Sequence, residues 1–284
     1  MHRFKAAIIV LALSVLGLTV PAAAQGGRFS IRLYGAPSLL SGGDVNDGQQ
    51  GMSDYWSRLA DMAGYSVTGA FGPARFGLEF GGDIVFQISP NLGIGLGAGY
   101  INAARESSIE FRQGSETLPE TVKPAYGSVP IRLGLFYTIP VSSKMSVVLS
   151  GGPELHLARA STLWTLTEGS DTIRQENTVK GTGLGFQAAA AFEFRLSPSI
   201  GLLLEIAGRY AKFGGLTGTF SSSDNSNSFE TTGTFYAVEI PGVGSERFLV
   251  VMVSEATPTG YLSVREAKLD LTGGSLRFGL VIHI

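Results

Sequence analysis

The few residues that could carry out acid–base or nucleophilic chemistry gather around one histidine. His156 stands two positions after Glu154, and Ser150 precedes both on the same alternate positions of an extended segment. These residue types could serve as a base, its orienting carboxylate and a nucleophile. Each step of two residues along a strand adds about 7 Å, however, which puts Ser150 beyond hydrogen-bond reach of His156. A nucleophile would have to come from another strand, and the simpler interpretation is a buried histidine paired with Glu154.

Other signals of site chemistry are weak or absent. The chain has no cysteine, which excludes disulfides, thiolate metal sites and a cysteine nucleophile. Gly183, Gly185 and Ala188 match a loose dinucleotide fingerprint, but they lie within an alternating segment and not at a strand-to-helix turn. The 21 Lys and Arg residues against 23 Asp and Glu residues give no basic excess for a nucleic acid. We therefore expect no catalytic residues, no cofactor, no metal, no nucleic-acid partner and no enzymatic activity.

The elements that would position these residues are segments in which every second residue is apolar. This alternation predicts β-strands with one apolar face. Eight such segments occur, at 29–33, 76–88, 92–100, 131–139, 145–157, 184–196, 200–210 and 276–284.

The charges within these segments all fall on the other face. Five are arginines and five are carboxylates: Arg32, Glu79, Asp83, Arg132, Glu154, Glu193, Arg195, Glu205, Arg209 and Arg277. Buried charges are tolerated when they are paired, and arginine is suited to bidentate pairing with carboxylates. Together with His156, these residues are predicted to form a structural ion-pair network inside a narrow lumen.

Aromatic residues stand near the ends of the apolar faces. Tyr100 and Tyr210 lie about ten residues into their segments, whereas Phe86 and Tyr137 lie near the opposite ends. Two aromatic belts of this kind are typical of the two interfaces of a bilayer. We therefore favour lipid outside the sheet over the alternative of a soluble sandwich or lectin-like barrel.

The connections between the predicted strands alternate between short and long. The short turns are at 89–91, 140–144 and 197–199, and the long connections are at 41–75, 101–129, 158–182 and 211–270. Outer-membrane barrels have short periplasmic turns and longer extracellular loops. The expected fold is therefore an all-β, closed antiparallel transmembrane β-barrel of eight strands, with ten as the alternative.

The N-terminus has the features of a secretory signal. A basic start at His2, Arg3 and Lys5 precedes an apolar stretch from 6 to 20 and the small residues 22–24. The sequence thus predicts a cleaved signal peptide at 1–24 and a single outer-membrane β-barrel domain at 25–284.

Two turns and the final segment carry a resemblance to a known family. The turns are Ser-Pro-Asn at 89–91 and Leu-Ser-Pro-Ser at 196–199, and the final segment is Leu-Arg-Phe-Gly-Leu-Val-Ile-His-Ile. With the signal and the eight strands, the chain resembles the small bacterial outer-membrane β-barrels of the porin-like superfamily, grouped with the OmpA membrane domain, OmpX and OmpW. The resemblance implies a bacterial outer-membrane location, contact with outer-membrane lipid, and recognition of the last strand by the barrel-assembly machinery. Ile284 departs from the terminal aromatic residue of that family.

The long connections carry further predicted elements. Ser53 as N-cap and Gly64 as stop predict a short helix. Segments 229–240 and 247–256 around Pro-Gly-Val-Gly predict a hairpin outside the membrane, or else two further membrane strands. The polar stretch 221–228 is expected to be a flexible loop.

These features lead to one principal functional hypothesis and two alternatives. The principal hypothesis is a non-enzymatic outer-membrane barrel with a plugged, ion-paired lumen that contributes to membrane integrity or makes surface contacts through its loops. The first alternative is OmpW-like passive passage of small or apolar solutes through a gap in the wall, for which Pro153 is the candidate because proline cannot donate to the ladder. The second is a lipid hydrolase that uses His156.

Overall fold

The computed structural model describes residues 29–114, 116–168, 171–242 and 245–284. The signal peptide expected at 1–24 lies outside the described residues. The described residues contain sixteen β-strands and one helix, α2 (Asp44–Met62). The strands are β1 (Phe29–Leu40), β2 (Ser66–Gly69), β3 (Phe76–Gln87), β4 (Leu92–Ala104), β5 (Ser107–Gln113), β6 (Glu116–Pro140), β7 (Met145–Glu168), β8 (Asp171–Arg195), β9 (Ile200–Tyr210), β10 (Lys212–Phe213), β11 (Thr217–Ser223), β12 (Ser228–Pro241), β13 (Arg247–Ser254), β14 (Ser263–Glu266), β15 (Leu269–Asp270) and β16 (Gly273–His283).

Eight of these strands are joined in a ring of antiparallel pairs. The order around the ring is β1, β3, β4, β6, β7, β8, β9 and β16, and β16 pairs with β1. Each of the eight segments with alternating hydrophobicity lies largely within one of these strands. The expected strand number of eight is nevertheless wrong for the fold, because the described chain has sixteen strands.

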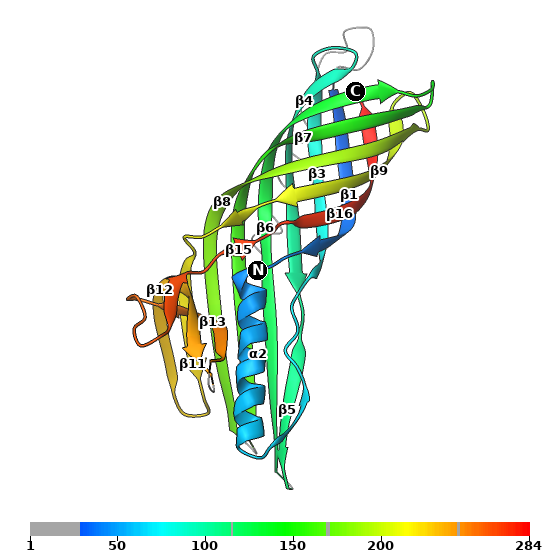
Figure 1. Cartoon of the computed structure of the whole chain (residues 1–284). Helices are drawn as coiled ribbons and strands as arrows, with labels where there is room; N and C mark the ends of the chain where they lie inside the picture. The colour runs from blue at the N-terminus through cyan, green and yellow to red at the C-terminus, as the bar shows by residue number, and fades with distance from the viewer. Residues whose placement is uncertain (1–28, 115, 169–170, 243–244) are drawn as a thin grey trace.

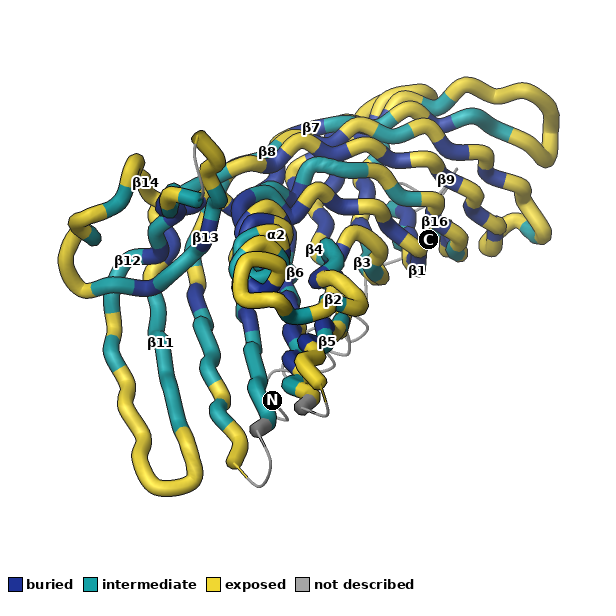
Figure 2. The backbone as a smooth tube through the Cα atoms, turned by 60° about the horizontal axis from the view of Figure 1, so that its bottom comes forward, coloured by how far each residue is buried: buried dark blue, intermediate teal, exposed yellow. Residues whose placement is uncertain are grey.

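The strands form in these segments because their two faces meet different surroundings. Successive side chains of a strand point to opposite sides of the sheet. Along β9, exposed and buried residues alternate without interruption: Leu202 and Leu204 are exposed, whereas Leu203 and Glu205 are buried. Figure 2 shows the same alternation around the ring. The apolar set therefore lies outside, and the charged set lies inside.

The other eight strands build an extension at the long-connection end of the ring. β6, β7 and β8 have 25, 24 and 25 residues, more than twice the roughly ten that a tilted strand needs to cross a bilayer. Beyond the ring, β5 pairs with β6, and β11 pairs with β8 and leads to β12 and β13. Figure 1 shows this extension below the ring. Most of the predicted long loops are thus sheet.

The predicted hairpin is confirmed as a pair of strands outside the ring. β12 and β13 pair from Thr234 with Ser254 to Pro241 with Arg247, so they do not add two strands to the ring. The predicted loop at 221–228 is wrong in part. Residues Ser221–Ser223 end β11, and Ser223 pairs with Ser228 at the start of β12.

The helix begins earlier than predicted. α2 starts at Asp44, so Ser53 is not its N-cap but lies within it, and the Ser53 hydroxyl accepts a hydrogen bond from the Phe71 amide at 3.1 Å. The predicted stop is correct, since Gly64 adopts a φ of 78° just after the helix. The N-terminal half of α2 is polar and contains two glycines, so no helical periodicity marks it. Contacts with distant parts of the chain stabilise this half of the helix instead.

Those contacts come from the segment before β16 and from β13. Arg265 donates two hydrogen bonds to the Asp44 carboxylate, at 2.5 and 2.7 Å, and the Lys268 amide donates a third at 2.6 Å. The bond to Asp44 raises the pKa of Arg265. Burial, followed by the charge of Asp44, raises the pKa of Asp47 in the same turn.

The interior is layered along the axis of the ring. Nearest the short turns is an apolar layer that includes Phe136, Leu203 and Val281. The charged side chains follow, and beyond them lies the apolar plug, which we define as the buried cluster Leu40, Val45, Ala74, Ile101, Ala103, Tyr126, Ala158, Ala160, Val179, Ala211, Leu216, Phe235, Ala237, Val253, Ala267, Leu269 and Leu271. The plug thus joins the ring to α2 and the extension.

Close packing of α2 on β13 yields a prediction at Gly51. A Cβ atom there would lie 1.9 Å from the carbonyl oxygen of Leu249. Glycine to alanine within a helix normally stabilises by about 0.5–1 kcal/mol. Gly51→Ala is instead expected to displace α2 and to speed tryptic cleavage after Arg58, whereas Gln50→Ala on the exposed side leaves cleavage unchanged. Slower cleavage of Gly51→Ala would contradict this packing.

Candidate functional site

The centre of the ring holds four arginines and four carboxylates, which we call the central cluster: Arg32, Arg132, Arg209, Arg277, Glu79, Asp83, Glu154 and Glu205. All eight residues are buried. They come from β1, β3, β6, β7, β9 and β16, whose inward positions meet in the middle of the ring. The charges are therefore arranged to neutralise one another across the interior and not along single strands.

Each of three arginines joins at least two acceptors. Arg209 donates to Glu154 at 2.8 Å and to Glu79 at 3.1 Å. Arg277 donates to Glu205 at 2.7 Å and also to Glu79. Arg132 donates to Asp83 from two nitrogens, at 2.6 and 3.1 Å. Arginine suits this role because its planar guanidinium presents several donors at fixed angles.

Two central members were not predicted from the sequence. The side-chain oxygen of Gln187 accepts bonds from Arg132 at 2.5 Å, Arg277 at 2.7 Å and Arg209 at 3.5 Å. The Tyr34 ring lies 4.4 Å from the Arg277 guanidinium carbon, and its hydroxyl accepts from Arg132 at 3.0 Å. Both residues occupy inward positions. The alternation of inward and outward positions along a strand would have identified them if uncharged polar and aromatic residues had been considered as well as charged ones.

Small residues make room for these side chains. A Cβ atom on Gly97 would lie 2.0 Å from the Asp83 carboxylate, and one on Gly95 would lie 2.6 Å from the Phe136 ring. The glycines at alternate positions of β4 therefore face the interior, where larger side chains would collide with the Asp83 carboxylate and the Phe136 ring.

His156 lies next to the central cluster, between a serine and a glutamate, which are the residue types of a Ser–His–acid catalytic triad. Its Nδ1 lies 3.1 Å from the Ser128 hydroxyl, and its Nε2 lies 3.4 Å from Glu154. Ser128 is the residue from a neighbouring strand that the spacing required, and β6 supplies it beside β7. His156 is 0% exposed and stacks on Phe213. A substrate carbonyl has no access to this hydroxyl, so the arrangement favours a structural role.

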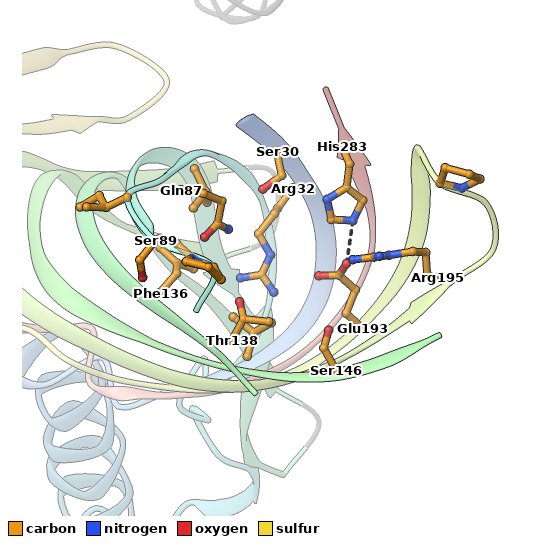
Figure 3. A pocket seen from close by; sticks show the side chains of 15 residues that line it. Ser30, Arg32, Gln87, Ser89, Phe136, Thr138, Ser146, Glu193, Arg195 and His283 are labelled. Carbon is orange, nitrogen blue, oxygen red and sulfur yellow. Dashed lines mark hydrogen bonds and ion pairs between the residues drawn. The ribbon is translucent and has the colours of Figure 1, made fainter. Parts of the chain in front are cut away.

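The remaining predicted members lie at the short-turn end. Glu193 is buried and pairs with His283 at 2.7 Å. Arg195 is exposed and forms no ion pair with any described residue, so it is not part of the buried network. These residues line the mouth of a cavity of about 560 Å³ (Figure 3).

The predicted interface aromatics lie on the outer face. Phe86, Tyr100, Tyr137 and Tyr210 are all exposed among the outward residues of the ring. Phe86 and Tyr137 lie near the short turns, and Tyr100 and Tyr210 lie toward the extension. This is the two-ended placement that the spacing predicts.

The wall is interrupted but not opened at Pro153. β7 pairs with β8 without a break, whereas the β6–β7 pairs stop at Arg132 with Glu154 and resume at Leu135 with Gly151. The register of the β6–β7 pairing is the same before and after this gap. A Cβ atom on Gly152 would lie 1.9 Å from the Leu133 carbonyl oxygen, so the two backbones remain in contact.

The described residues provide neither a membrane-spanning helix nor a cluster of metal ligands. α2, their single helix, is not apolar enough to cross a membrane. No group of three or more His, Cys, Asp or Glu side chains in the described ranges is placed to hold a metal ion.

Comparison with known proteins gives structural likenesses only. No family model and no curated protein matches the chain. A major outer membrane protein from Thermus thermophilus is 14% identical, with a TM-score of 0.42 over 90% of this chain and 99% of that one. The outer membrane protease OmpT from Escherichia coli is 10% identical, with a TM-score of 0.42 over 92% and 99% of the two chains.

A third solved structure, the outer membrane protein OprG from Pseudomonas aeruginosa, is 14% identical, with a TM-score of 0.37 over 92% of this chain and 98% of that one. All three are bacterial outer-membrane proteins by description. Because every TM-score is below 0.5, these likenesses decide neither the fold nor the function of this chain.

The central cluster generates a stability prediction. Arg277→Met leaves Glu79 and Glu205 buried with one fewer partner each. Loss of one member of a buried ion pair costs about 3–5 kcal/mol, so a large loss of unfolding free energy is expected in urea titrations of the folded protein in micelles. Arg174→Met, at an exposed pair with Glu176, is the control and should cost about 0–1 kcal/mol. Equal losses would show that the cluster does not stabilise the ring.

The His156 arrangement generates a second prediction. His156→Gln is expected to leave the phospholipid and lipid A composition of the cells unchanged, because the site is inaccessible. It should lower stability by about 1–3 kcal/mol, since Ser128 loses a buried partner. His283→Gln, at a partly exposed pair, is the control with the smaller loss. A lipid change confined to His156→Gln would instead indicate a hydrolase.

Proposed function

We propose that this chain is a non-enzymatic β-barrel protein of a bacterial outer membrane, whose blocked interior supports an extracellular sheet. The observation that carries the proposal is the reversed distribution of side chains in the ring. Large apolar residues are exposed on its outside, and paired charges are buried within. A soluble barrel would expose its charges to water, whereas lipid requires an apolar exterior and fully paired backbone groups.

The interior supports a role other than an open channel. The central cluster spans the middle of the ring, and the apolar plug fills the interior beyond it toward α2. The interior of a barrel of about eight strands is wide enough for its own side chains or one small ligand, but not for an aqueous channel. We therefore infer that the protein contributes to membrane integrity or surface contacts and does not conduct ions.

The extension is the part of the molecule available for such contacts. β6, β7 and β8 continue well beyond the exposed apolar band, and β11, β12 and β13 widen the sheet that they form (Figure 1). Apolar packing of α2 against β5 and β6, with Phe71, Ile109 and Val122 buried, stabilises this part independently of lipid. We assign it to the cell exterior, with the short turns in the periplasm.

The passage of small or apolar solutes through the wall remains the second candidate. The missing ladder pairs beside Pro153 favour it, since the wall there has fewer hydrogen bonds. The close approach of Gly152 to Leu133 weighs against it. A lateral route would need these strands to separate.

Conductance distinguishes the blocked barrel from a channel. The full mature protein, reconstituted in planar lipid bilayers, is expected to give no stable, sizeable ion current. Outer-membrane fractionation and a band shift between boiled and unboiled gel samples should accompany this result. Stable conductance steps in protein that shows the band shift would contradict the blocked interior.

The orientation can be tested because the chain has no cysteine. Ser226 lies at the exposed tip between β11 and β12, and Ser143 lies in an exposed short turn. A membrane-impermeant maleimide should label Ser226→Cys on intact cells and label Ser143→Cys only after the outer membrane is permeabilised. The reverse pattern would overturn the assignment of the extension to the cell exterior.

A further inference from the structure

The cavity at the short-turn end has the features of a ligand site. The proposed role of a blocked barrel does not need such a site. It has a volume of about 560 Å³ and opens beside the turns at 88–90 and 198. Arg32 and Phe136 lie deep within it, and Ser30, Gln87 and Ser146 line its sides (Figure 3). The Glu193–His283 pair lies toward the mouth.

Arg32 differs from the other arginines of the central cluster in its unmet hydrogen bonding. It is only 3% exposed, yet neither Nη1 nor Nη2 has a hydrogen-bond partner among the described residues. The nearest carboxylate oxygen, of Glu205, lies 3.6 Å from Nη1, and the other oxygen of Glu205 accepts from Arg277 at 2.7 Å. A buried guanidinium without acceptors is costly, so Arg32 has donors available for a ligand.

The surroundings of Arg32 combine this charge with apolar surface. Its guanidinium carbon lies 5.4 Å from the centre of the Phe136 ring, and Val85 and Val148 belong to the same wall. Gln87 has a side-chain oxygen that lacks a hydrogen-bond partner in the described part of the chain. A ligand here would meet the donors of Arg32, the acceptor oxygen of Gln87 and apolar side chains around its body.

We propose that this cavity binds a small monocarboxylate with an apolar body, held by bidentate hydrogen bonds to Arg32. A carboxylate matches the fork of a guanidinium. Glu205 lies 3.6 Å from Arg32 and Glu193 lines the cavity, so a second negative charge beside Arg32 is disfavoured, which argues against phosphate. The second arginine of the lining, Arg195, is exposed at the mouth. In the proposed orientation the ligand enters from the periplasm, and the plug separates it from the cell exterior. Binding itself does not depend on that orientation.

The test uses the full mature chain refolded in detergent micelles and 4-fluorobenzoate as the probe, followed by fluorine NMR. We expect saturable binding of 4-fluorobenzoate and at least tenfold weaker binding of the neutral 4-fluorobenzamide. Inorganic phosphate should not compete. Absence of saturable 4-fluorobenzoate binding, or equal binding of the amide, would overturn the proposal, and competition by phosphate would overturn the monocarboxylate assignment.

Three variants locate the site. Arg32→Gln should weaken 4-fluorobenzoate binding at least tenfold. Ser146→Phe fills the cavity without removing Arg32 and should have a similar effect, which keeps the test valid if Arg32→Gln does not fold. Arg112→Gln, at an exposed position of β5 away from the cavity, is the control that should bind as the unaltered protein does. Each is used only if it shows the gel band shift of the folded protein, and equal binding by all of them would indicate partition into detergent and overturn the proposal.

Discussion

The whole structure depends on the requirement that no polar group be left unpaired where lipid replaces water. In the proposed bilayer, a strand can satisfy its backbone only by pairing on both sides, and the ring of eight strands does this through the pairing of β1 with β16. The same requirement fixes the side chains. Apolar residues occupy the outward positions, and the inward positions receive every buried charge of the ring.

The paired charges in turn determine what else the interior can contain. Gln187 provides one oxygen that three arginines share, and Tyr34 covers Arg277 and bonds Arg132, so the cluster is joined into a single unit. Long side chains need small neighbours, which explains why glycines face inward on β4. Arg32 alone among the cluster's arginines has unmet donors on both terminal nitrogens in the described structure, and it lies deep in the cavity.

The sequence allowed the ring and most of its buried charges to be predicted because a strand repeats every two residues, so facing can be read residue by residue. Arg195 was assigned wrongly to the network. It is the last residue of β8, where an inward position in the alternation no longer means that the side chain is buried. The extension was underestimated because strands outside lipid need no strict alternation. The start of α2 was missed because its first turns depend on Asp44 with Arg265, which are distant in sequence. Ser128 and Gln187 were missed because neither is charged.

The central claim is that one face of each ring strand meets lipid and the other meets paired charges. Single cysteines introduced along β9 from Ile200 to Ile206, each carrying a nitroxide spin label in lipid bilayers, test it directly by their accessibility to oxygen, which concentrates in lipid. The account predicts high accessibility at Ile200, Leu202, Leu204 and Ile206 and low accessibility at Gly201, Leu203 and Glu205. Uniform accessibility, or the opposite alternation with Glu205 facing lipid, would contradict it.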